Sequence, residues 1–183
     1  MKKLSYLTTF IFFLCSCSTV KFYADYNEQT DFIKYNTYSK IIWNIENDSV
    51  VNDITKEKVL SAVEKELSIR AISENELNGD ISININFIRK DKIGTSSYTD
   101  YNGYYSYGYY RPMGYSTTSY YNYTYTEGSI VIDIFDETTK KLIWQGTAKQ
   151  DFNSEPSSPI STEKINYIIQ NIFKKYPVKP IKK

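Results

Sequence analysis

The side chains that could carry chemistry are few in this chain of 183 residues. It has no histidine, and its only cysteines are Cys15 and Cys17, so histidine-based triads, histidine-ligated metals, zinc knuckles and disulfide scaffolds are excluded. Asp133, Asp136 and Glu137 could in principle bind calcium or form the acid pair of a glycosidase. Their spacing favours structural roles, because Asp133 alternates with isoleucines and the other two occupy a turn. We therefore expect no catalytic residues and no metal.

The N-terminus has the segments of a bacterial lipoprotein signal in the right order. Two lysines precede an eleven-residue apolar stretch, Leu4–Leu14, which is too short to cross a bilayer. The following Leu-Cys-Ser-Cys resembles the lipobox, and Cys17 is its matching cysteine, whereas Cys15 would place large residues where small ones are needed. We expect a signal peptide at 1–16, an acylated cysteine with a short tether at 17–19, and no cofactor besides the covalent lipid. The alternative is an ordinary signal peptide with an incidental cysteine.

The residues after Cys17 predict where the anchored protein resides. Ser18 is not the aspartate that favours retention in the inner membrane, and no acidic run follows to suggest surface display. We expect an outer-membrane lipoprotein on the periplasmic face, anchored by lipid and without a transmembrane helix. A tether of about 10 Å keeps the domain close to the bilayer. Ser49 lies in a short motif that resembles an O-glycosylation acceptor, for which an ordinary loop is the alternative.

The segment 98–125 is the most unusual part of the sequence, because it holds 12 of the 19 tyrosines in 28 residues. Tyrosine combines a large ring with a hydroxyl group, which suits protein interfaces, sugar faces and membrane headgroups. The alternative is a strand with Tyr121, Tyr123 and Tyr125 on one face and a disordered tip. A nucleic-acid partner is not expected, because the chain balances 22 basic against 21 acidic residues. The candidate binding surface is Tyr101, Tyr104, Tyr105, Tyr107, Tyr109, Tyr110 and Tyr115.

Hydrophobic periodicity predicts an α+β fold, an antiparallel or mixed β-sheet with two helices packed on one face and a long Tyr-rich hairpin loop. One helix is capped by Asn52 or Asp53, and the other by Ser158 or Ser161. Alternating apolar residues predict strands at 20–26, 37–43, 81–87, 119–126, 129–135 and 142–149. We expect a single domain over 20–177 with a Tyr-rich insert at 98–118, followed by a basic tail at 178–183.

Several blocks of this sequence resemble lipoproteins of the domain of unknown function 4136 family. They are Asp-Tyr-Asn at 25–27, 31–38, Glu-Gly-Ser-Ile-Val-Ile-Asp-Ile-Phe-Asp at 127–136, Leu-Ile-Trp-Gln-Gly at 142–146, and 172–177. The resemblance implies an envelope lipoprotein with an α+β domain and assigns no catalytic residue. We thus expect a non-enzymatic binding or structural protein that partners the membrane and an envelope protein or glycan. The alternative is a module that binds glycan or peptidoglycan through the Tyr-rich loop.

Overall fold

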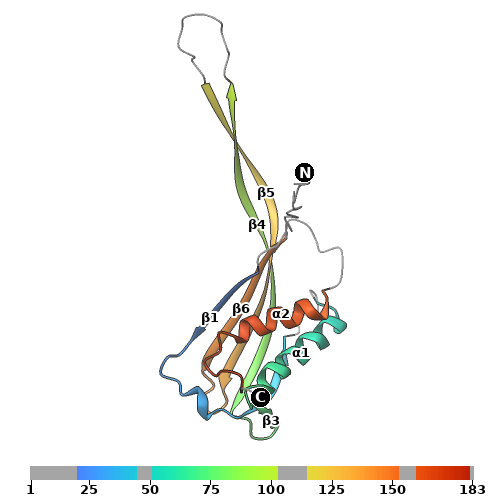
Figure 1. Ribbon diagram of the computed structural model, residues 1–183, viewed down its shortest axis with the longest axis vertical. Helices are drawn as coiled ribbons and strands as arrows, with labels where there is room; N and C mark the ends of the chain where they lie inside the picture. The colour runs from blue at the N-terminus through green and yellow to red at the C-terminus, as the bar shows by residue number, and fades with distance from the viewer. Residues whose placement is uncertain (1–19, 45–50, 103–114, 153–159, 182–183) are drawn as a thin grey trace, which may run out of the picture.

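The fold is a mixed β-sheet with two helices, which confirms the predicted α+β class (Figure 1). A computed structural model describes residues 20–44, 51–102, 115–152 and 160–181. The lipidation candidate Cys17 and the glycosylation candidate Ser49 lie outside these residues. The elements are β1 (Lys21–Tyr26), η1 (Phe32–Lys34), β2 (Thr37–Trp43), α1 (Asp53–Ser68), β3 (Ser73–Glu74), β4 (Ile81–Asn102), β5 (Tyr115–Asp136), β6 (Leu142–Phe152) and α2 (Thr162–Phe173).

The six strands lie in the order β1-β6-β5-β4-β2-β3. The neighbours from β1 to β4 in this order are antiparallel, whereas β2 runs parallel to both β4 and β3. The strands predicted at 119–126 and 129–135 are one continuous strand, β5. β4 likewise continues far past Phe87, where the predicted strand ended. The described residues of the predicted insert, 98–102 and 115–118, are therefore paired strand.

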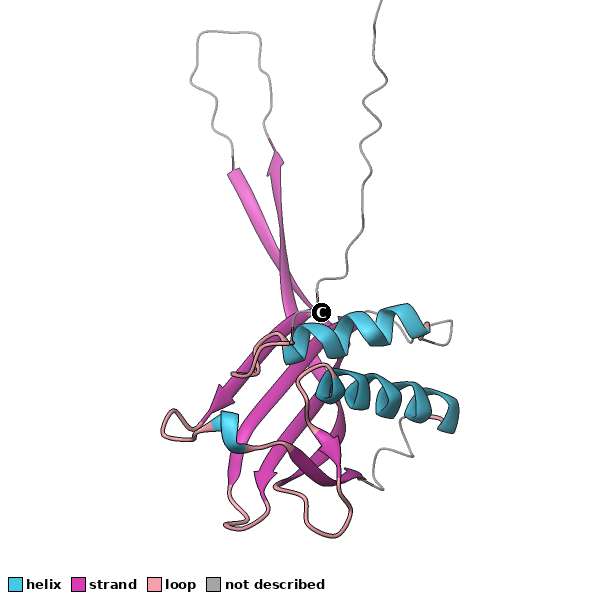
Figure 2. Cartoon of the chain, turned by 60° about the horizontal axis from the view of Figure 1, so that its bottom comes forward, coloured by secondary structure: helices cyan, strands magenta, loops and turns pink. Residues whose placement is uncertain are grey.

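Both helices pack on one face of the sheet, as expected (Figure 2). Buried isoleucines occupy every second position along β4 and β5 on this face. The residues between them in each strand point to the second face. Burial of one face only is what produces the alternating sequence pattern. The fully buried contributors are Val59, Val63 and Leu67 of α1, Ile165, Ile169 and Ile172 of α2, and Ile81, Ile83, Ile85, Ile132, Ile134 and Trp144 of the sheet.

Side-chain caps determine where the helices begin. The Asn52 carboxamide oxygen accepts a hydrogen bond from the Thr55 backbone N–H at 2.9 Å, and the Ser161 hydroxyl accepts one from the Lys164 backbone N–H at 3.2 Å. Each cap satisfies a donor that a helix leaves unpaired at its first turn. The structure thus selects Asn52 and Ser161 from the two predicted pairs. Within the described segments, neither helix is long and apolar enough to span a membrane.

Candidate interaction surface

β4 and β5 extend beyond the rest of the sheet as a two-stranded ribbon (Figure 1). β2 last pairs with β4 at Trp43–Ile85, and β6 last pairs with β5 at Thr126–Phe152. The two strands then pair with each other from Lys92–Tyr125 to Asn102–Tyr115, which is eleven pairs. At about 3.4 Å per residue, this β4–β5 ribbon is about 34 Å long. Residues 92–102 and 115–125 are its strands.

One face of the ribbon carries a row of tyrosines. The register places Tyr121, Tyr123 and Tyr125 of β5 on the same face as Tyr98 of β4. Tyr98, Tyr121 and Tyr123 expose 62%, 57% and 45% of their surface. The rings of Tyr123 and Tyr125 have centroids 6.0 Å apart. These four residues form the tyrosine face, which continues the sheet face that the helices leave uncovered.

A glycine positions the middle of the tyrosine face. Gly94 of β4 lies directly opposite Tyr123 of β5. A Cβ atom at position 94 would lie 2.6 Å from the Tyr123 ring, so the ring covers the space that a larger residue would fill. An aromatic ring over a cross-strand glycine stabilises a pair that lacks one side chain. Tyr123 is therefore held flat against the ribbon rather than projecting freely.

The opposite face of the ribbon is mostly polar and links the two strands. The Thr95 hydroxyl donates to the Asn122 carboxamide oxygen at 2.9 Å, and the hydroxyls of Thr99 and Thr118 are 3.0 Å apart. Ile93 and Tyr120 are exposed on this face. Cross-strand pairs of this kind contribute roughly 0.2–1 kcal/mol each, so they help to hold the ribbon without a core beneath it.

Four lysines surround the base of the ribbon on the side of the tyrosine face. The register places Lys90 and Lys92 of β4, Lys149 of β6 and Lys21 of β1 on this face, and we call them the lysine collar. Lys92 Nζ contacts Glu127 Oε2 at 2.6 Å. This hydrogen bond raises the pKa of Lys92 and lowers that of Glu127.

The carboxylates of β5 and its turn make separate sets of contacts. Asp133 and Asp136 point to opposite faces of the sheet, because they are three positions apart on one strand and successive side chains alternate between the faces. Asp133 accepts hydrogen bonds from Gln145 at 2.7 Å and Asn86 at 3.2 Å, and burial raises its pKa. Its partners are uncharged and belong to neighbouring strands. The described chain contains no group of three acidic, histidine or cysteine residues that could hold a metal.

Asp136 instead holds the end of the sheet opposite the ribbon. Its carboxylate accepts a hydrogen bond from the Tyr35 hydroxyl at 2.7 Å and two from Thr139, one from the backbone N–H and one from the hydroxyl. The bond from Tyr35 is the main reason that the pKa of Asp136 falls to about 2. Glu137 contacts Lys140 and Ser39 in the same region. These contacts fit the structural roles predicted for both carboxylates.

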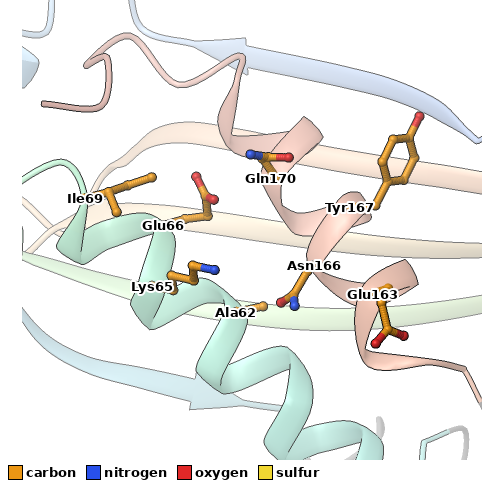
Figure 3. A pocket seen from close by; sticks show the side chains of 8 residues that line it. All are labelled: Ala62, Lys65, Glu66, Ile69, Glu163, Asn166, Tyr167 and Gln170. Atoms are coloured by element: carbon orange, nitrogen blue, oxygen red, sulfur yellow. The ribbon is translucent and has the colours of Figure 1, made fainter. Parts of the chain in front are cut away.

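A shallow groove between α1 and α2 is the second feature that could bind a ligand (Figure 3). Its volume is about 390 Å³. The Glu66 carboxylate at its edge is already paired with Arg70 at 2.7 Å, so it does not offer a free charge to a ligand. The groove is lined by amide groups and by side chains of both charges, so its lining favours neither sign of charge in a ligand. Its lining residues are Ala62, Lys65, Glu66, Ile69, Glu163, Asn166, Tyr167 and Gln170.

The structure places only part of the predicted binding surface. Tyr101 and Tyr115 lie on the ribbon, where they pair with Ser116 and Asn102. The other predicted tyrosines, Tyr104, Tyr105, Tyr107, Tyr109 and Tyr110, lie outside the described residues. The prediction left out Tyr98 and the lysine collar. Tyr121, Tyr123 and Tyr125 do share one strand face, as the alternative interpretation proposed, but that face is exposed.

A solved structure of low sequence identity shares the fold of this chain. A PDZ domain protein from Parabacteroides distasonis matches with a TM-score of 0.54 and 12% identity; the match covers 89% of this chain but 37% of that one. This chain thus spans little more than a third of that protein. Two PelC dodecamer structures from Paraburkholderia phytofirmans match with TM-scores of 0.46 and 0.44, at 7% and 8% identity. These matches cover 90% and 84% of this chain, and 100% and 94% of the PelC chains.

Sequence comparison identifies the family. No curated protein matches the chain. The model of a domain of unknown function, DUF4136, matches residues 22–178, which include all the described strands and helices apart from the first residue of β1. The chain therefore belongs to the DUF4136 family, as the sequence blocks predicted.

Proposed function

We propose that this protein is an outer-membrane-anchored lipoprotein that faces the periplasm and has a non-enzymatic binding or structural role in the cell envelope. The observation that carries the binding role is the β4–β5 ribbon with its tyrosine face. Among the 21 ribbon positions whose backbone is described from Ile93 to Tyr125, Asp100 is the one charged residue and seven are tyrosines. Such a surface is suited to contact rather than to solvation.

An uncovered ribbon is costly for the protein, which supports a partner for it. A two-stranded hairpin is at best marginally stable alone in water, and the outer edge of each ribbon strand presents unpaired backbone groups. Tyr98 and Tyr121 expose more than half of their surface. Tyrosine rings lose little side-chain entropy on binding and keep a hydroxyl group for hydrogen bonds. Contact along the tyrosine face would therefore gain burial at low entropic cost.

The membrane anchor rests on Cys17 and its lipobox. A variant Cys17→Ser should no longer incorporate labelled palmitate, and it should leave the membrane fraction or keep its signal peptide. Ser18→Ala is the matched control, because it changes the neighbouring residue and leaves the acylated thiol in place. Palmitate incorporation by the Cys17→Ser variant would contradict the assignment.

Photo-crosslinking in cells tests the binding role directly. A photoreactive residue at position 121 samples the tyrosine face, and the same residue at Leu77, which is 90% exposed in the loop before β4, serves as the control. We expect a discrete adduct from position 121 and none from position 77. Equal labelling from both positions, or none from either, would contradict a binding role for the ribbon.

A second candidate function is binding of glycan or peptidoglycan through the same face. The neighbouring rings of Tyr123 and Tyr125 favour it, because successive aromatic rings on one face can stack on successive sugars. The protein should then cosediment with isolated sacculi, and Tyr123→Ala should weaken this binding while Tyr120→Ala on the opposite face should not. Cosedimentation that both variants retain would exclude this site.

A further inference from the structure

The anchored end of the chain and the β4–β5 ribbon lie at the same end of the sheet. β6 runs toward the ribbon and ends beside Thr126 of β5. β1 is antiparallel to β6, with Lys21 paired to Lys149, so the chain that precedes β1 leaves the sheet at the ribbon end. Figure 1 shows the start of β1 near the point where β4 and β5 separate from the other strands. Any membrane that holds Cys17 must therefore lie at this end.

The ribbon is long compared with the tether. Three residue steps join Cys17 to Val20, which span at most about 10 Å. The row that contains Lys21 and Lys149 reaches Ile88 on β4, four residues before the ribbon begins at Lys92. The ribbon thus starts about 14 Å beyond this row and extends about 34 Å further. Because the bilayer is held so close to the base of the ribbon, a ribbon of this length that pointed toward it would enter it. The ribbon must therefore lie along the bilayer surface or turn away from it.

The bilayer interior is closed to an isolated ribbon. Open strand edges do not occur in the hydrocarbon region, because each unpaired backbone group there costs several kcal/mol. The headgroup region does not impose this cost, since water and lipid oxygens satisfy the edges. Tyrosine is enriched at this depth in membrane proteins because its ring is apolar and its hydroxyl group is polar. The composition of the ribbon strands suits the surface and not the core of a membrane.

Charge distinguishes the two faces of the ribbon. The lysine collar places four positive charges at the base of the tyrosine face, against three carboxylates on the same face: Glu127 and Asp151 at the base and Asp100 on the ribbon itself. Glu127 is occupied by Lys92 at 2.6 Å, and Lys149 also lies over the Tyr23 ring at 5.9 Å. The net charge on this side is positive. Basic side chains near a membrane surface are attracted to anionic lipid headgroups.

We propose that the ribbon lies along the membrane that holds the lipid anchor, with the tyrosine face and the lysine collar against anionic phospholipid headgroups. This inference rests on the proposed anchoring at Cys17 and adds the ligand of the binding surface. The ribbon and the acyl chains form two points of attachment at one end of the sheet. The helices and the end of the sheet near Asp136 then face the periplasm.

A fluorescent probe on the acylated protein tests this arrangement. Cleavage removes Cys15 and acylation blocks the Cys17 thiol, so one introduced cysteine is the only free thiol in the mature chain. Three single variants carry the probe: Tyr121→Cys on the tyrosine face, Tyr120→Cys on the opposite face, and Leu77→Cys far from the ribbon. Each is reconstituted into vesicles of phosphatidylethanolamine and phosphatidylglycerol that contain a headgroup spin label.

We expect strong quenching of the probe at position 121, weaker quenching at 120 and none at 77. Replacing Lys90 or Lys149 with glutamine should lower the ratio of bound to free ribbon about fivefold each, whereas Lys141→Gln at the opposite end of the sheet should have no effect. In vesicles of phosphatidylcholine alone, the quenching of the probe at position 121 should likewise be weaker. Quenching at 121 no greater than at 77, in protein shown to carry palmitate, would overturn the inference while leaving the anchor intact.

Failure of the anchor gives a different result. A chain that incorporates no palmitate refutes anchoring at Cys17. The probe is then placed at position 121 of a chain that also carries Cys15→Ser and Cys17→Ser, and added vesicles still report whether the ribbon binds headgroups. A probe that is shielded in cells but not quenched in protein-free vesicles would overturn the inference in favour of a protein or glycan partner.

Discussion

The contact between Tyr35 and Asp136 provides a quantitative test of the fold. The Asp136 side chain is almost fully buried, accepts three hydrogen bonds, and lies 3.6 Å from the Lys34 ammonium group. These interactions require the charged carboxylate. We predict that Asp136→Asn destabilises the protein in a manner that depends strongly on pH, because asparagine keeps the shape of the side chain and loses its charge.

The magnitude of the destabilisation follows from the pKa of the Asp136 carboxyl group, whose ordinary value of 3.8 falls to about 2 in the folded protein. This difference corresponds to about 2 kcal/mol of stability, at 1.36 kcal/mol for each pH unit. The native carboxylate stays charged at a lower pH than the carboxylate of the unfolded chain. Its contribution is therefore complete at neutral pH, and it is lost as the pH falls through 3.8 toward 2.

Urea unfolding followed by tryptophan fluorescence measures this effect, since Trp144 is fully buried. We expect Asp136→Asn to lower the free energy of unfolding by about 2 kcal/mol at pH 7, and to have little effect near pH 2. Tyr35→Phe removes the main donor, so the double variant should lose less than the sum of the two single losses. An equal loss at pH 7 and pH 2 would refute the assigned role of the charge.

Three further predictions concern the ribbon and the core. Deletion of Ser97–Ser119 should leave the thermal midpoint nearly unchanged, because no described residue of that segment belongs to the core, and a collapse would show that the ribbon supports the fold. Gly146→Ala should cost about 1–3 kcal/mol in urea unfolding, since the new Cβ would lie 2.2 Å from the Trp144 ring, and wild-type stability would disprove this close packing. Arg70→Met leaves the buried Glu66 carboxylate without its ion-pair partner and should lower the free energy of unfolding by about 3–5 kcal/mol. Adding Glu66→Gln in the same chain should restore part of this loss, and an unchanged stability of Arg70→Met would contradict the importance of the pair.

Local sequence pattern predicted an element well where one face is buried. The alternation from Ile81 to Phe87 identified the first part of β4, because the helices cover the odd-numbered residues there. The alternation stops beyond Ile88, since no helix lies over the ribbon, and the predicted strand ended at that point although the backbone pairing continues to Asn102. Pairing without burial leaves a weaker signal in the sequence, which explains why the pattern predicts an insert at 98–118 although residues 98–102 and 115–118 are paired strand.

Local patterns predict the class of the fold and the family and narrow each helix cap to two residues, because capping, amphipathic periodicity and contiguous motifs are local properties. The contact between Tyr35 and Asp136 and the position of Gly94 beneath Tyr123 arise only in the folded chain. The tertiary structure also brought the start of β1, the lysine collar and the tyrosine face to one end of the molecule. These juxtapositions depend on strand order and register between distant segments, which no local pattern encodes.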